Sequence, residues 1–245
     1  MLATFHADLH LHTCLSPCAE EEMGPLAIVR QAKKKGLDVI GICDHNSAGN
    51  VAAVRQAGRR EGLAVIGGVE VCSEEEVHIL GLFDEQESLL NMQRLIEENL
   101  HGENNPELFG QQSLCDQNDA VVARETRLLI GATELSVDEV VEKIHQLGGL
   151  AVASHVDRES FSLFSQLGFV PRGLQIDALE ISPLHSVAEA GDSFPQTKGY
   201  RLVSFSDAHR LEEIGTTFTT FRGISPSVKE FRKALLGEDE REILN

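Results

Sequence analysis

Residues 3–12 of the chain read ATFHADLHLH, an apolar run that ends in two histidines, His10 and His12. The run is short and nearly continuous, which predicts a buried strand. Because alternate residues of a strand point to the same face, we expect both imidazoles to lie on one side. The stretch therefore predicts a strand that delivers two metal-capable side chains to its downstream end.

The same pattern recurs along the chain. Further strands are predicted at 37–43, 63–71, 77–83, 150–154, 178–182, 201–205 and 216–221. Helices are predicted between most of these strands, and this order favours an α/β fold with a mainly parallel sheet or barrel. We expect one domain over residues 1–245, with an insertion around 102–130 that begins as a long polar loop at 102–119.

Histidines and carboxylates stand at the downstream ends of several predicted strands. In a parallel barrel these ends share one mouth, so residues scattered along the chain converge there. Imidazole and carboxylate groups suit zinc, manganese or iron, and a carboxylate can bridge two ions. The spacing therefore predicts a multinuclear metal site. The residues concerned are His10, His12, His45, Glu70, His155, Asp207 and His209.

Several short segments, taken in order, resemble the four motifs of the PHP (polymerase and histidinol phosphatase) family of phosphoesterases. They are DLHLHT at 8–13, CDHN at 43–46, GVE at 68–70, SH at 154–155 and SDAH at 206–209. The resemblance covers residues 3–83 and 145–223. It implies a distorted (β/α)7 barrel of the TIM-like type, with two or three divalent ions in its mouth.

The resemblance also implies how the ions share their ligands. His10, His12, Glu70 and Asp207 would hold one ion, Glu70, His78 and His155 would surround a second, and His45 and His209 would serve a third. The family often has a His or Asp shortly after the second His of the first motif, where this chain has Pro17 and Cys18. Cys18 is our candidate for that ligand; the alternatives are a structural cysteine and a separate zinc site with Cys14.

Other residues near these motifs have expected roles. Asp8 and Asp44 are expected to accept hydrogen bonds from ligand imidazoles and so to fix their tautomers. His78 begins an apolar run, so it could cap the strand instead of binding a metal. His155, His209 and Asp207 are candidate catalytic residues, with the proton for the leaving oxygen coming from metal-bound water or a nearby His.

Two residues are candidates for substrate binding. Arg158 is the best-placed guanidinium for bidentate phosphate contact, the alternative being a surface ion pair with Asp157 or Glu159. His185, near a strand end, is a candidate for substrate contact at most.

The composition narrows the function. With 39 Asp+Glu against 21 Lys+Arg, the formal net charge is −18, which disfavours extended nucleic acid or an anionic membrane as a partner. We predict a metal-dependent phosphoric ester hydrolase that acts on a small phosphorylated metabolite or nucleotide, with a metal-bridging hydroxide as nucleophile. The alternatives are an exonuclease or phosphodiesterase on short nucleic acid, a noncatalytic metal-binding module and a metal-dependent amidohydrolase.

The five cysteines make an odd number in a chain of 245 residues, so a disulfide scaffold is not expected and a reducing cytoplasm is favoured. The N-terminal stretch has no basic segment followed by a long apolar run, and no later stretch approaches the ~18 apolar residues of a membrane span. We therefore expect a cytoplasmic protein with no membrane partner. The sequence leaves the oligomeric state open.

Overall fold

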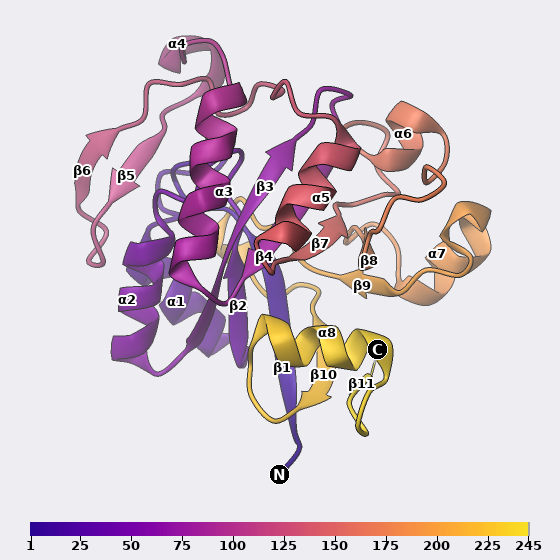
Figure 1. Cartoon of the computed structure of the whole chain (residues 1–245). Helices are drawn as coiled ribbons and strands as arrows, with labels where there is room; N and C mark the ends of the chain where they lie inside the picture. Colours follow the sequence, from indigo (N-terminus) through magenta and orange to yellow (C-terminus); the bar gives the residue numbers. More distant parts are fainter. Residues whose placement is uncertain (245) are drawn as a thin grey trace.

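The computed structural model describes residues 1–244 and contains one curled nine-stranded sheet, in the order β11-β10-β1-β2-β3-β4-β7-β8-β9. Figure 1 shows the larger helices packed along this sheet. The strands are β1 (Ala3–Leu11), β2 (Val39–Ile42), β3 (Ala64–Cys72), β4 (His78–Phe83), β7 (Leu150–Ala153), β8 (Ala178–Ile181), β9 (Leu202–Ser204), β10 (Thr219–Gly223) and β11 (Glu242–Ile243).

Two groups of strands in the sheet are parallel. β1, β2 and β3 run in one direction, and β7, β8 and β9 are parallel to one another. β4, however, is antiparallel to both β3 and β7, and β10 is antiparallel to β1 and β11. The expectation of a mainly parallel sheet is therefore wrong for β4 and β10, and β11 is a strand that the sequence did not predict. A short turn joins β3 to β4, and only antiparallel strands can be connected so closely.

Helices lie between the strands, as the sequence predicts. They are α1 (Pro25–Lys34), α2 (Val51–Glu61), α3 (Gln86–Asn99), α4 (Pro106–Phe109), α5 (Val137–Gln146), α6 (Leu163–Leu167), α7 (Val187–Ser193) and α8 (Val228–Leu236), with short 3-10 turns η1 (Pro195–Thr197) and η2 (Leu211–Glu213). α5 begins with a capping box, because Ser136 Oγ accepts from Glu139 N and the Glu139 carboxylate accepts from Ser136 N. α6, α7 and the 3-10 turns are too short to give a clear periodic signal.

The insertion is more ordered than predicted. Residues 102–130 contain α4 and a hairpin of β5 (Ser113–Cys115) and β6 (Val121–Arg124), which Figure 1 shows standing apart from the main sheet beside α3. Asn50 attaches this hairpin to the start of α2, because its side chain donates to Ser113 O and accepts from Cys115 N. The prediction of a long loop at 102–119 is therefore wrong at α4 and β5, which are too short to give a periodic signal in the sequence.

The buried apolar residues form two clusters, on the two sides of the sheet. The larger one lies between the sheet and the surrounding helices, and includes Ile28, Val54 and Ile144. The smaller one includes Leu9 and Phe205 and is closed by α8. Within residues 1–244, no helix has both the length and the apolar character needed to cross a bilayer.

Candidate metal centre

Strand ends bring the predicted ligands together. His10 lies on β1, Glu70 on β3 and His78 at the first position of β4, while the remaining candidates lie in the loops that follow β1, β2, β7 and β9. His10 Nε2 lies 3.2 Å from His12 Nε2, so the two imidazoles predicted to share a face do so. The cluster is therefore assembled from strands that are far apart in sequence.

Glu70 occupies the centre of this cluster and is only 1% exposed. Its carboxylate oxygens lie within 3.5 Å of ring nitrogens from five histidines. These are His10 (3.4 Å), His12 (3.5 Å), His45 (2.9 Å), His78 (3.1 Å) and His155 (3.3 Å). Asp207 completes the group, with Oδ1 at 3.2 Å from His10 Nε2 and 3.0 Å from His12 Nε2.

Contacts at Nδ1 orient three of the imidazoles. His10 Nδ1 lies 3.0 Å from both carboxylate oxygens of Glu180, and His209 Nδ1 donates to the Asp207 carbonyl at 2.8 Å. His12 Nδ1 lies 2.8 Å from Ser16 Oγ, and that hydroxyl donates its own proton to Asp44. Each Nδ1 therefore carries the proton, which leaves each Nε2 as a lone-pair donor.

The carboxylates that orient the ligands differ from those expected. Asp8 accepts hydrogen bonds from Ser206 N, Ser206 Oγ and Gly215 N. These bonds anchor the loop after β9, and none of them involves an imidazole. Asp44 reaches His12 only through Ser16. The expectation that both would bind imidazoles directly is therefore wrong. Glu180, on β8, takes that role, and its only signal in the sequence is a carboxylate within an apolar run.

Several buried polar atoms of the cluster lack a hydrogen-bond partner. They are Glu70 Oε1 and Oε2, His78 Nδ1, His155 Nδ1 and Asp207 Oδ1. Lone pairs from both kinds of side chain face one another, an arrangement that costs free energy unless a cation lies between them. Among residues 1–244, three sets of side chains have ligand atoms close enough to hold an ion. These are His10, His12 and Glu70; His45, Glu70 and His78; and His12, His45 and His209. The donor set therefore fits divalent cations.

The electrostatics favour the ligand forms of Glu70, Asp207 and His12, whereas burial is outweighed by neighbouring carboxylates that raise the pKa of His10 and His45. Burial by itself would raise the pKa of Glu70, but His78 and His10 outweigh it and hold that pKa well below its usual value. Burial would also raise the pKa of Asp207, but His10 outweighs this effect and holds that pKa well below its usual value. Burial and two neighbouring imidazoles lower the pKa of His12 well below its usual value. Charged carboxylates and a neutral His12 are the states that bind cations.

The backbone is strained where it presents these groups. Asn46, His155 and Asp207 have φ values of 48°, 29° and 49°, in the left-handed region that non-glycine residues rarely adopt. Each follows closely on a strand end. Strain of this kind costs on the order of 1–3 kcal/mol per residue and is concentrated at functional sites.

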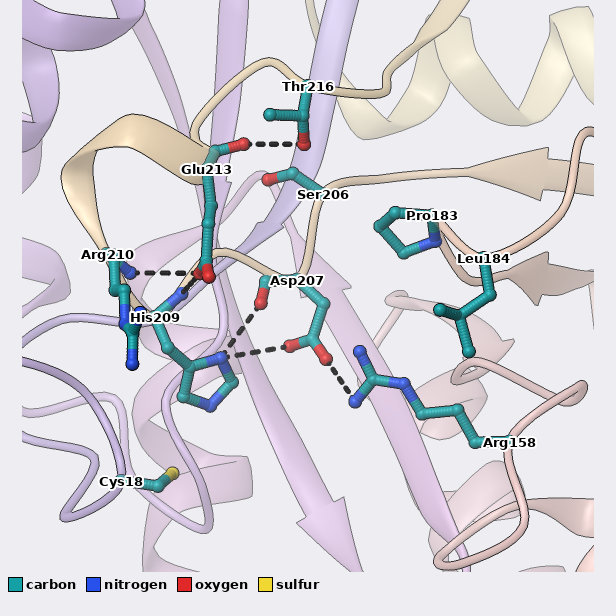
Figure 2. A pocket seen from close by; sticks show the side chains of 10 residues that line it. All are labelled: Cys18, Arg158, Pro183, Leu184, Ser206, Asp207, His209, Arg210, Glu213 and Thr216. Carbon is teal, nitrogen blue, oxygen red and sulfur yellow. Dashed lines mark hydrogen bonds and ion pairs between the residues drawn. The ribbon is translucent and has the colours of Figure 1, made fainter.

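Arg158 contacts the cluster directly. Its Nη1 lies 2.7 Å from Asp207 Oδ2, so it pairs with neither Asp157 nor Glu159 in this contact. It lines a cavity of about 530 Å³ together with Cys18, Asp207 and His209. Figure 2 shows Arg158 and His209 on opposite sides of the Asp207 carboxylate, with Cys18 on the side of His209.

Cys18 is the thiol on this side of the cluster. Burial would raise its pKa, but His45 and His209 outweigh that effect and lower the pKa to about 6. Cys14 lies elsewhere, with its Sγ 3.4 Å from Cys115 Sγ. Cys14 therefore contacts Cys115 in the insertion and not Cys18, which disfavours a separate zinc site on Cys14 and Cys18.

The structure places His185 away from these ligands. Its Nδ1 lies 2.7 Å from Asp157 Oδ2, and it lines a different cavity with Val187 and Phe218. The histidines without an expected role also have carboxylate partners. These pairs are His6 with Asp38, His101 with Glu134, and His145 with Asp177.

Comparison with known proteins supports a family assignment. The model of the PHP domain matches residues 8–147, and a second model, described as PHP-associated, matches residues 192–238. The chain is 25% identical over 189 residues to a 5′-3′ exoribonuclease of Haemophilus influenzae, which covers 60% of this chain and 68% of that protein. It is 31% identical over 80 residues to a phosphoribosyl 1,2-cyclic phosphate 1,2-diphosphodiesterase of Eggerthella lenta, covering 31% of this chain and 29% of that enzyme.

The fold has a counterpart among solved structures. The lesion-specific endonuclease PfuEndoQ from Pyrococcus furiosus superposes with a TM-score of 0.75 at 19% identity, covering 98% of this chain. The present chain spans only 58% of that endonuclease. The motif resemblance noted in the sequence is confirmed by the family match, which covers more than half of the residues. The chain belongs to the PHP domain family of metal-dependent hydrolases.

Proposed function

We propose that this protein hydrolyses a phosphate ester of a small metabolite or nucleotide. The observation that carries the proposal is the environment of Glu70, whose two buried oxygens lack hydrogen bonds and face imidazoles from five histidines. A cluster of this charge and composition supports binding of two or three zinc, manganese or iron ions. The fold class agrees with a PHP-type barrel, and we infer a distorted (β/α)7 arrangement within one domain over residues 1–245.

We propose the ligand sets that the family resemblance implies, with Cys18 as an added candidate. We assign His10, His12, Glu70 and Asp207 to one ion, Glu70, His78 and His155 to a second, and His45, His209 and Cys18 to a third. Bound ions would supply an activated water and would neutralise charge on the phosphoryl group.

The protein's own contribution is to bind and orient the phosphoryl group. Arg158 can donate two parallel hydrogen bonds to its oxygens, as guanidinium groups do. Asp207 positions Arg158 through Oδ2 while its Oδ1 faces His10 and His12. The same carboxylate therefore joins the phosphate-binding side chain to the metal ligands.

Proton transfer to the leaving oxygen requires a donor near the cavity of about 530 Å³ that Arg158 lines. His209 lines that cavity and holds its Nδ1 proton against the Asp207 carbonyl. Its orientation is thereby fixed, with the Nε2 lone pair available to a cation. We assign His209 and His155 first as ligands, and a water held at the cluster or another nearby histidine would serve as the proton donor.

The experiment combines metal analysis with a phosphatase panel, on the wild type and on His10→Ala. We expect stoichiometric metal and phosphatase activity in the wild type, and loss of both in the variant. His6→Ala is the control, because His6 is exposed and pairs with Asp38. A wild type without metal, or a fully active His10→Ala protein, would contradict the proposal.

A second candidate function is hydrolysis of short nucleic acid. The similarity to the Haemophilus influenzae exoribonuclease favours it. The net charge of −18 disfavours binding of a long strand, although the local field at the metal cluster can attract a short one. A noncatalytic role would follow if purified protein held metal but hydrolysed no phosphate ester. The cytoplasmic location remains a prediction from the cysteine content.

A further inference from the structure

Two loops meet on the side of the metal cluster where Arg158 lies. The loop after β7 carries His155 and Arg158, and the loop after β8 carries Pro183 and Leu184. The last three of these residues line one cavity of about 530 Å³, and Figure 2 shows them on the same side of the Asp207 carboxylate. The relative position of the two loops therefore shapes this side of the cavity.

The carboxylate of Asp157 joins the two loops. Its Oδ1 accepts a hydrogen bond from Ser182 N at 2.8 Å, and its Oδ2 accepts one from Ser182 Oγ at 2.8 Å. His185 Nδ1 lies 2.7 Å from the same Oδ2. Because an ionised carboxylate can only accept, the proton of this contact lies on His185 Nδ1. The side chain of Asp157 is 0% exposed, so these three donors compensate a buried charge.

The turn at 182–185 contacts both Asp157 and the cavity. Leu184 N donates to Ser182 Oγ at 3.2 Å, and His185 N donates to Ser182 O at 3.3 Å, so the turn is closed by its own hydrogen bonds. Its two ends, Ser182 and His185, hold Asp157, whereas Pro183 and Leu184 between them line the cavity. A shift of Asp157 would therefore move one wall of the cavity relative to the other.

The sheet holds the backbone on both sides of His155. Ser154 N donates to a carbonyl of β4 at 3.1 Å, and Val156 N donates to a carbonyl of β8 at 2.9 Å. These bonds fix the metal-ligand candidate without help from Asp157. We therefore expect His155 to stay in place when the carboxylate of Asp157 is removed.

Arg158 lies beyond these contacts with the strands. Its N donates to His155 O at 2.9 Å and its O accepts from Ser162 Oγ at 2.8 Å, so both backbone bonds stay within the loop. Its side chain is 36% exposed and reaches Asp207 Oδ2. An arginine side chain has many rotamers, so the place of its guanidinium depends on where the loop holds its Cα. Asp157, the preceding residue, ties that part of the loop to the 182–185 turn.

We propose, on the basis of the phosphate ester hydrolysis inferred above, that Asp157 is a positioning residue for the phosphoryl group. By holding the 182–185 turn against the loop after β7, it fixes the place of Arg158 and so the affinity of the site for phosphate. His185 acts through Asp157, as its third donor, in place of the substrate contact expected from the sequence. Neither Asp157 nor His185 lines the cavity that Arg158 lines.

The first test compares KM and kcat of the metal-loaded full chain with p-nitrophenyl phosphate. Asp157→Asn keeps the size of the side chain but loses its charge and one acceptor oxygen. We expect KM to rise about 10-fold with kcat nearly unchanged, the pattern of a loss in substrate binding. Asp192→Asn, at an exposed position on α7, is the control and should have the wild-type KM. A wild-type KM in Asp157→Asn, or a fall in kcat alone, would overturn the proposal.

A pair of variants tests the role of His185. His185→Ala removes the third donor to Asp157 and should raise KM by about 5-fold, the size of one lost hydrogen bond. Asparagine offers an N–H near the position of Nδ1, so His185→Asn should restore most of the wild-type KM. Failure of asparagine to restore KM would assign His185 to direct substrate contact and would overturn its role through Asp157.

A double-mutant cycle shows whether Asp157 acts through Arg158. Once Arg158→Ala has removed the guanidinium, Asp157→Asn should change KM no further. A purely structural role would instead weaken binding by the same factor in both backgrounds, and that result would overturn the proposal. Bound metal, measured by inductively coupled plasma mass spectrometry, should stay at the wild-type level. Its loss from Asp157→Asn would assign Asp157 to the support of His155 and would also overturn the proposal.

Binding of inorganic phosphate to the metal-loaded protein, measured by isothermal titration calorimetry, separates this proposal from the phosphatase function, because it needs no turnover. If the wild type binds phosphate but hydrolyses no ester, the phosphatase function fails, while weaker phosphate binding by Asp157→Asn still supports the positioning role. If the wild type hydrolyses esters and Asp157→Asn keeps both the wild-type KM and the wild-type phosphate affinity, the phosphatase function stands and only the positioning role fails.

Discussion

His10 Nδ1 lies 3.0 Å from both carboxylate oxygens of Glu180, and both side chains are completely buried. A buried carboxylate is costly unless a hydrogen bond or a positive charge compensates it. The imidazole provides that compensation, and in return its Nε2 is held toward Glu70 and Asp207. The pair therefore fixes the direction in which the first metal ligand of the chain points.

Glu180→Gln should weaken metal binding by about 10-fold and Glu180→Ala by up to about 100-fold, the range seen when such supporting residues are removed. The glutamine keeps an acceptor for His10 Nδ1 but loses the charge that makes the imidazole a stronger donor. Competition with a fluorescent chelator measures the affinity. Glu189→Gln, at an exposed helix cap, is the control. Unchanged affinity in both Glu180 variants would show that the contact serves packing alone.

Removal of metal should destabilise the fold. The unpartnered oxygens of Glu70 and Asp207 then face imidazole lone pairs without a cation. Binding of an ion at 100 times its dissociation constant adds about 2.7 kcal/mol per site. We expect chelation to lower Tm, and added Zn²⁺ or Mn²⁺ to restore it, by thermal unfolding followed with circular dichroism. An identical Tm with and without chelator would argue against an intrinsic metal site.

Arg158→Lys should raise KM or lower kcat by about 10-fold, because a lysine ammonium cannot donate two parallel hydrogen bonds to a phosphoryl group. Bound metal, measured by inductively coupled plasma mass spectrometry, should stay at the wild-type level. Arg172→Lys, at an exposed position, provides the comparison. Loss of metal in Arg158→Lys would instead show that Arg158 holds Asp207 in position as a metal ligand.

If Cys18 is a metal ligand, its thiolate should change the absorption spectrum of the cobalt-substituted protein. Thiolate coordination adds a charge-transfer band in the near ultraviolet, which imidazole and carboxylate ligands do not give. We expect the band in the wild type and its loss in Cys18→Ser, with Cys72→Ser unchanged because Cys72 is buried on β3. A spectrum without the band in the wild type would remove Cys18 from the ligand set.

Ionisation of Glu230, on α8, should make the free energy of unfolding depend on pH in the acid range. Hydrogen bonds from Arg241, opposed by burial, lower the pKa of Glu230 below its usual value of 4.5. A carboxylate with a lowered folded-state pKa contributes stability above its unfolded pKa and loses it as the pH falls through the folded-state value.

We therefore expect Glu230→Gln to cost about 1–3 kcal/mol at pH 7, the typical effect of leaving charged hydrogen-bond partners unsatisfied. The difference from the wild type should shrink below about pH 4.5. Urea unfolding at several pH values measures it, with Glu238→Gln as the exposed control. A difference that stays constant with pH would exclude ionisation of Glu230 as the cause.

Local sequence determined most of what is local in the structure. The apolar run that carries His10 is a strand as predicted, and the capping box of Ser136 and Glu139, a local sequence pattern, starts a helix. The order of the motifs was sufficient for the family, because polar residues at the ends of buried strands are rarely present without a function. The insertion was misjudged because its strands are short and β6 is exposed, so that they lack the periodicity on which prediction depends.

Only the tertiary structure decided which partners those residues meet. Glu180 lies 170 positions from His10 in sequence, and Arg158 pairs with Asp207 and not with its neighbours. Such contacts depend on the order and direction of the strands, including the antiparallel β4 that places His78 beside Glu70. Sequence thus determined the kinds of side chain available, whereas strand pairing over long separations determined which of them share one buried site.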